Sequence, residues 1–256
     1  MPRKVLKNKP LIEAIFELKW ELKEIGEGLK IDPHYKILVG SLYSKLKTEY
    51  PYHEQLPSAS IPDDIAGHVI QHRFRKGENQ WPLVQIGPGI FTVNDTEGYI
   101  WEEFESKIIS AVNALRGTHP ESENLKINSL LLRYIDAINF NFETYNIFDF
   151  LAEKMKTTVK PYPELFKETN VDSTPLSFDW RFSFPCKRPD GVIHLRFVRG
   201  KKANEDGLIW ETMVQSTNEQ VLQIPEKLTE WLKDAHTLTR DWFFKIIEGE
   251  LERRFE

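Results

Sequence analysis

The sequence predicts an α+β fold in which helices pack on one face of an antiparallel sheet. Two kinds of periodicity indicate this fold. Apolar and polar residues alternate over 12–22 and 176–184, which is typical of strands with one buried face. Other segments repeat apolar residues at helical spacing, and the longest of them follows Pro225.

The predicted elements follow one another in nearly the same order twice. The first half gives a strand at 12–22, a helix at 34–50, strands at 68–76 and 81–94, and a helix at 98–116. The second half gives a strand at 127–142, a helix at 146–157, strands at 176–184, 192–199 and 208–215, and the last helix. Both halves therefore contain a strand-helix-strand-strand-helix pattern, with one strand added in the second.

This order predicts a duplication, with pseudo-repeats at 10–120 and 126–252. A second arrangement stays open, in which 12–140 forms a βαββαβ ferredoxin-like unit and the rest forms another layer. No linker rich in Gly or Ser separates the halves. We therefore expect residues 1–256 to form a single continuous body.

The composition argues against several classes of function. The chain has 34 basic and 39 acidic residues and a net charge of -5, so no global positive field attracts nucleic acid. Local binding of nucleic acid through the basic segment 1–9 and through Lys201 and Lys202 is the weakest of the functional hypotheses. Cys186 is the single cysteine, which excludes an intramolecular disulfide and a cysteine-based metal site.

The same composition predicts a cytoplasmic protein. A single cysteine fits a reducing compartment. No apolar run reaches the roughly 20 residues that span a bilayer. Glu13 and Glu17 interrupt the first apolar stretch, so the start does not read as a signal peptide. We expect no association with a membrane.

Residues 86–94, IGPGIFTVN, raise the question of a phosphate-binding loop. Such a loop needs several converging backbone N–H groups, and Pro88 removes one of them. Neither common phosphate-loop spacing occurs, and the next helix begins several residues later. We therefore predict a bend or bulge within a strand.

Two further candidates do not assemble into a chemical site. His68 and His72 have metal-ligand spacing only on a helix. On the predicted strand they lie about 13 Å apart, too far for one ion with bonds of about 2.1 Å. Cys186 stands near Lys187 and Arg188, but without a dyad partner it is expected to be a spectator thiol. The sequence thus predicts no catalytic residue, metal or cofactor.

The most suggestive polar residues interrupt apolar strands. They are Arg133, Asp179, Arg181, Arg196 and Glu211. If the helices cover one face of the sheet, these side chains line the other face and form a polar groove for a ligand or partner. The alternative is a solvated face held by cross-strand ion pairs, each worth up to about 1 kcal/mol.

The last helix has an apolar stripe suited to contact with a partner or a second copy. We assign Trp231, His236, Trp242 and Phe243 to this interface. His236 lies beside the stripe, and no serine or cysteine with nucleophile context accompanies it. We therefore expect His236 to bond a neighbouring strand or a partner chain rather than to act as a general base.

Four blocks of the sequence, at 10–20, 83–104, 130–138 and 228–247, carry a family resemblance. In this order they resemble a sporadically distributed family of uncharacterised bacterial proteins of similar length. The resemblance covers nearly the whole chain, carries no catalytic signature and transfers no functional residue. A patchy distribution is typical of mobile accessory genes, including phage-defence and toxin–antitoxin components.

These observations together predict a non-enzymatic protein-interaction component of a bacterial accessory or defence system. Its expected partner is another protein or a second copy of the chain. The alternative is a small-molecule-binding protein, or an unrecognised enzyme, that uses the Arg-bearing sheet face.

Overall fold

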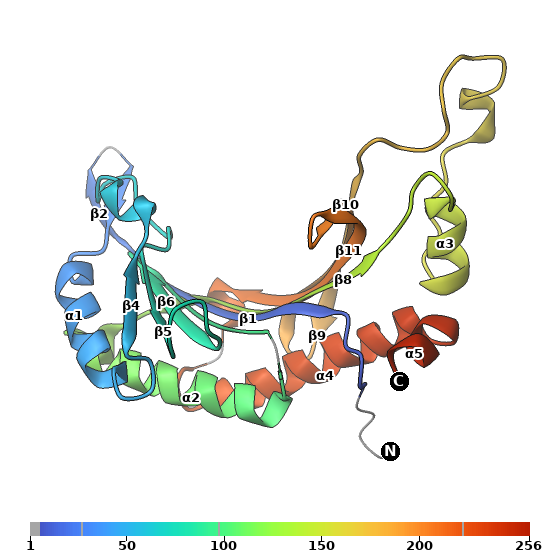
Figure 1. Ribbon diagram of the computed structural model, residues 1–256. Coiled ribbons are helices and arrows are strands. Elements are labelled where there is room, and N and C mark those ends of the chain that lie inside the picture. The colour runs from blue at the N-terminus through green and yellow to red at the C-terminus, as the bar shows by residue number, and fades with distance from the viewer. Residues whose placement is uncertain (1–5, 27, 97, 222) are drawn as a thin grey trace.

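A computed structural model describes residues 6–256 except 27, 97 and 222, and it confirms the α+β class (Figure 1). Over these residues one antiparallel sheet has nine strands in the order β4-β5-β6-β7-β1-β8-β11-β10-β9. The strands are β1 (Leu11–Trp20), β4 (Tyr52–Gln55), β5 (His72–Arg75), β6 (Leu83–Gly87), β7 (Ile90–Asp95), β8 (Ile127–Asn139), β9 (Asp179–Lys187), β10 (Asp190–Lys202) and β11 (Glu205–Thr217). A separate hairpin pairs β2 (Lys23–Gly26) with β3 (Leu29–Ile31).

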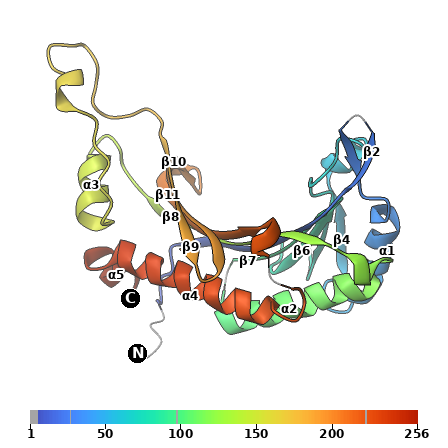
Figure 2. The ribbon, with the colours of Figure 1, turned by 180° about the vertical axis from the view of Figure 1, so that it is seen from behind.

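Three helices cover one face of the sheet, as Figures 1 and 2 show from opposite sides. They are α1 (Tyr35–Leu46), α2 (Trp101–Thr118) and α4 (Leu228–Ile247). Their apolar stripes and the alternate residues of β1 are buried in one core, which includes Phe16, Leu42, Phe104 and Leu232. The amphipathic period of each helix thus matches the single buried face of the sheet.

A second core lies at the end of the sheet where β9, β10 and β11 meet the short helices α3 (Ile147–Lys154) and α5 (Glu250–Phe255). Phe197 and Trp210 are fully buried there, next to Leu151. The side chain of Asn146 caps α3 by accepting hydrogen bonds from the backbone N–H groups of Phe148 and Asp149. This core fixes the end of the sheet that carries most of the predicted groove residues.

The two halves of the chain meet at the centre of the sheet, where β1 pairs with β8 in antiparallel orientation. Outward from β1 the order is β7, β6, β5 and β4, and outward from β8 it is β11, β10 and β9. In each half a helix follows the strand next to the centre, α2 after β7 and α4 after β11. The duplication stays a prediction. A superposition of residues 10–120 on residues 126–252 would test it.

The Gly-Pro-Gly segment is a hairpin turn, so the predicted bend within a strand is wrong. Strand β6 ends at Gly87, β7 begins at Ile90, and these two residues pair with each other. Pro88 and Gly89 therefore form a two-residue turn, and the φ of 75° at Gly89 suits the second central position of a type II turn. The N–H of Gly89 donates to Asp32 Oδ2 at 3.2 Å, which fastens the turn to the chain.

Two other predicted strands have different bounds. The segment 68–76 is a strand only over His72–Arg75, because His68 has a φ of 61° and lies in the preceding loop. The histidine pair therefore does not share a strand. Strand β9 begins only at Asp179, and Leu176, which precedes it, is 90% exposed. Strands β9 and β10 are joined by a turn at Arg188 and Pro189, since Asp190 already pairs with Lys187.

Among the described residues, no helix has the length and hydropathy that crossing a membrane requires. No group of three His, Cys, Asp or Glu side chains in the same part of the chain is close enough to hold a metal ion.

Candidate functional site

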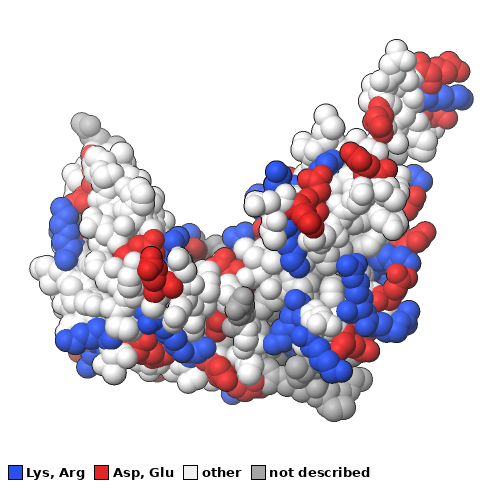
Figure 3. Space-filling view, in the orientation of Figure 1, with Lys and Arg blue, Asp and Glu red and all other residues white. Residues whose placement is uncertain are grey.

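The sheet face opposite α1, α2 and α4 is open and curved. In the space-filling view it forms a broad hollow between two raised ends of the molecule (Figure 3). We call this surface the concave face and define it by the side chains of β1 and β4–β11 that point away from the helices. On β8, for example, Leu131, Arg133 and Ile135 point to this face, while Leu132 and Tyr134 are buried on the other.

The five predicted groove residues are joined in one chain of ion pairs across β8, β11, β10 and β9. Arg133 Nη2 lies 2.8 Å from Glu211 Oε2, and Glu211 Oε1 lies 2.7 Å from Arg196 Nη1. Arg196 also donates to both carboxylate oxygens of Asp179, at 2.7 and 2.9 Å. Asp179 in turn accepts two longer bonds of 3.3 Å from Arg181. We call this set the arginine network.

The pairing of the strands brings these residues together. Arg196 stands directly opposite Glu211 on β11 and directly opposite Arg181 on β9. Asp179 lies two residues from Arg181 on the same strand face, within diagonal reach of Arg196. The alternation of side chains along each strand therefore determines which of them face the hollow. The pairing register between strands determines which of them form ion pairs.

The arginine network is buried at its centre and exposed at its β9 end. Side-chain exposure rises from 11% at Glu211 to 67% at Arg181. Hydrogen bonds from Arg196 and Arg181 lower the pKa of Asp179 to about 2, and the bond to Asp179 raises the pKa of Arg196. Three guanidinium groups face two carboxylates, so the network carries one positive charge in excess, and its most exposed cation is Arg181.

A second polar cluster on the concave face escaped the sequence analysis. Glu54 of β4 accepts from Arg75 Nε at 3.2 Å and lies 3.9 Å from Arg73 Nη1. Arg73 also donates to Gln85 at 2.6 Å. The sequence signal was present, because Arg73 and Arg75 flank the buried Phe74 just as charged residues interrupt the other strands. Both halves of the sheet thus carry arginine–carboxylate pairs on this face.

Half-buried apolar side chains occupy the middle of the concave face. They include Ile15 of β1, Leu131 and Ile135 of β8, and Ile209 and Met213 of β11. Each alternates with a fully or largely buried neighbour on its strand. Charged side chains stand between these apolar ones, since Glu211 lies between Ile209 and Met213, and Glu13 and Glu17 flank Ile15 on the same strand face.

The four residues predicted to form an interface on the last helix do not lie together on one exposed surface. Trp231 is fully buried and donates from Nε1 to Ser216 Oγ at 2.9 Å, so it belongs to the core of this chain. Trp242 is half-buried and meets Phe184 edge to face. The apolar stripe of α4 is covered by the sheet of its own chain. The same helical spacing of apolar residues would result from burial against a sheet or against a partner.

His236 and Phe243 lie on the same helix but line a cavity under the sheet. His236 Nδ1 lies 3.0 Å from the hydroxyl of Tyr134 on β8. We expected His236 to bond either a neighbouring strand or a partner chain. The structure provides the neighbouring strand.

The remaining candidates have local roles. Cys186 Sγ donates to the carbonyl of Pro189, and burial, with a contribution from Asp190, raises the pKa of the thiol. The thiolate is therefore disfavoured there. Lys202 Nζ donates to the carbonyl of Ala137 at 2.8 Å, while Lys201 is exposed. Of the basic segment 1–9, residues 1–5 lie outside the described residues.

No protein-family model matches the chain, and a search of curated proteins finds no match either.

Proposed function

We propose that the protein is an interaction component whose concave face binds an acidic segment of a protein partner. The observation that carries this proposal is the arginine network, which ends at an exposed arginine and holds more cations than anions. A carboxylate of the partner at Arg181 would balance the excess charge. Charge complementarity of this kind directs a partner to a surface and fixes its register.

The apolar side chains of the concave face support the same proposal. Interfaces between proteins commonly combine an apolar core with a polar rim. Here the half-buried side chains of β8 and β11 lie beside Arg133 and Glu211 of the arginine network. A partner that covers the hollow would bury these apolar side chains and meet the charged side chains next to them.

The sequence resemblance extends this proposal to biological context. We infer that the partner belongs to a bacterial accessory or defence system and that binding takes place in the cytoplasm. A second copy of the chain is the other partner that the sequence predicts. Light scattering of the purified chain distinguishes the two, because self-association doubles the mass of 30.1 kDa.

The test is affinity capture from the native host, with cross-linking to map the contact. We expect the wild-type chain and an Arg254→Glu control, altered on the exposed surface of α5, to capture the same partner. Arg181→Glu should lose it, and capture should weaken as salt is raised. Cross-links confined to α1, α2 and α4, or equal capture by Arg181→Glu, would contradict the proposal.

A further inference from the structure

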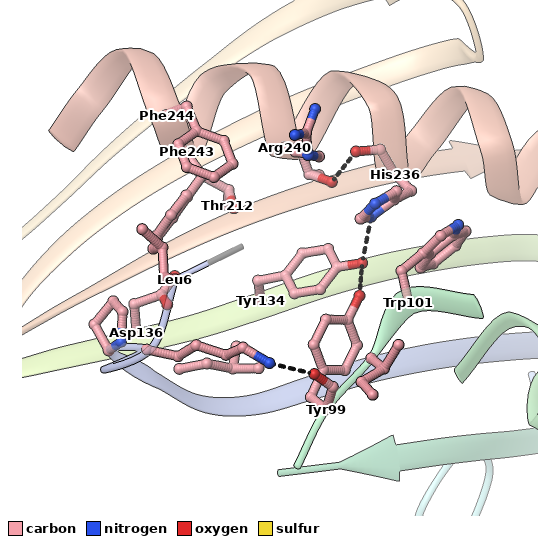
Figure 4. A pocket seen from close by; sticks show the side chains of 15 residues that line it. Leu6, Tyr99, Trp101, Tyr134, Asp136, Thr212, His236, Arg240, Phe243 and Phe244 are labelled. Carbon is pink, nitrogen blue, oxygen red and sulfur yellow. Dashed lines mark hydrogen bonds between the residues drawn. The ribbon is translucent and has the colours of Figure 1, made fainter. Parts of the chain in front are cut away.

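A cavity of about 270 Å³ lies on the opposite side of the sheet from the concave face (Figure 4). It lies between β8 and β11, the first turn of α2 and the second half of α4. Leu11, Trp101, Phe243 and Phe244 supply much of its apolar wall. A dry apolar cavity of roughly 150 Å³ is enough to bind benzene, so this one has room for a larger guest.

Two buried polar side chains in this cavity have unused hydrogen-bonding capacity. Asp136 is 2% exposed and Thr212 is fully buried. Within the part of the chain that the structure describes, neither Asp136 Oδ2 nor Thr212 Oγ1 has a hydrogen-bond partner. They lie close together on one sheet face, because Asp136 pairs with Trp210 and Thr212 pairs with Tyr134 on the adjacent strand. Buried polar groups without partners cost stability, so their presence calls for a reason.

The other polar groups of the cavity are held in a fixed chain. The hydroxyls of Tyr99 and Tyr134 lie 2.9 Å apart, and the latter lies 3.0 Å from His236 Nδ1. His236 stacks on Trp101 with the ring centroids 3.8 Å apart and the planes 3° apart. Figure 4 shows this chain running from Tyr99, just before α2, through Tyr134 to His236 of α4. Contacts of this kind pre-form a site and reduce the entropy lost on binding.

The surroundings of the cavity disfavour a charged guest. Burial raises the pKa of Asp136 to about 8, even though Lys202 opposes the shift. The same loss of hydration would penalise a charge on a ligand. The two basic residues that line the cavity are already engaged, since Lys9 donates to the carbonyl of Tyr99 and Arg240 lies 5.0 Å over the ring of Phe244.

We propose that this cavity binds a neutral molecule of one or two fused rings that carries a single hydroxyl, carbonyl or amide group. The rings contact Trp101 and Phe243, and the polar group bonds to Asp136 and Thr212. Protonated Asp136 and the threonine hydroxyl each donate and accept, so they fit all three polar groups. This site is separate from the concave face, and its occupancy does not depend on a protein partner.

Calorimetric titration of the full chain with 2-naphthol tests the proposal. The charged counterparts 2-naphthoate and 2-naphthylmethylammonium serve as controls of similar shape. We expect saturable 1:1 binding of 2-naphthol at pH 7 and binding at least about tenfold weaker for both charged molecules. Absence of saturable 2-naphthol binding overturns the site, and tighter binding of a charged counterpart overturns the ligand class.

Thr212→Val separates a binding site from a structural defect. Valine keeps the shape of threonine and removes a hydroxyl without a partner, so the ligand-free variant should unfold at a higher temperature. Its affinity for 2-naphthol should fall roughly fivefold, the equivalent of one neutral hydrogen bond. Thr237→Val, on the exposed side of α4, should change neither property.

Two outcomes of the variant experiments are decisive. Unchanged affinity in Thr212→Val and in Asp136→Asn would overturn the assignment of the polar group. Arg181→Glu should bind 2-naphthol like the wild-type chain, and a loss of binding there would overturn the separation of the two sites.

Discussion

The imidazole of His236 lies parallel to the indole of Trp101, 3.8 Å away, and this contact joins the middle of α4 to the first turn of α2. The same imidazole lies within hydrogen-bond distance of Tyr134 on β8. One side chain therefore links two helices and the sheet.

Replacement of His236 by alanine should destabilise the protein. Loss of the stacking and of the bond to Tyr134 should lower the free energy of unfolding by about 2 kcal/mol, as measured by urea denaturation. Lys233→Ala, at an exposed position of the same helix, should change it by less than about 0.5 kcal/mol. Equal effects of the two substitutions would show that the stack adds no stability.

The ion pairs of the arginine network should contribute unequally to the stability of the protein. Glu211 is largely buried and serves two arginines, whereas the pair of Asp179 and Arg181 is exposed. A double-mutant cycle on Arg196 and Glu211 should give a coupling of about 1 kcal/mol. The cycle on Arg181 and Asp179 should give a smaller value, which falls further in salt. The reverse order would contradict the burial argument.

Asp136 should make the stability of the protein fall as the pH rises. Its folded pKa of about 8 lies above the ordinary value of 3.8 for this carboxyl group, so the unfolded chain loses this proton first. Between these values the contribution of Asp136 should fall by up to about 1.4 kcal/mol per pH unit, and above pH 8 it should level off. The stability advantage of Asp136→Asn should therefore grow from pH 5 to pH 8 in urea denaturation. A difference that is constant with pH would contradict the raised pKa.

Two glycines should respond to alanine in opposite directions. A Cβ on Gly87 would lie 1.8 Å from the carbonyl oxygen of Val69, so Gly87→Ala should destabilise the protein by more than about 2 kcal/mol. Gly40 lies inside α1 with no atom within 4 Å of such a Cβ. Gly40→Ala should stabilise by about 0.5–1 kcal/mol. Thermal and urea denaturation of both variants provide the check.

Local patterns predicted the elements whose two faces differ. The alternation around Phe16 and Leu18 identified β1, and the same rule placed Arg181 and Asp179 on one strand face. The rule did not find the hairpin of β6 and β7, because apolar residues continue on both sides of Pro88. Nor did it find the β2–β3 hairpin, which is mostly exposed and has no buried face to produce a pattern.

The sites depend more strongly on tertiary structure. A helical stripe looks the same whether a sheet or a partner covers it, which is why Trp231 was assigned to an interface and is found in the core. Asp136 and Thr212 meet only through the register of β8 and β11. No local signal in the sequence indicates that two distant polar residues will share a cavity.

The pairing of β1 with β8 also has a consequence during synthesis on the ribosome. Leu11 pairs with Asp136, so β1 waits for more than a hundred further residues before this neighbour exists. At ordinary rates of translation this delay is roughly ten seconds. Throughout it, an apolar strand with an unpaired edge is free to join similar strands of other nascent chains. We therefore expect the growing chain to depend on chaperones that shield β1 until the second half arrives.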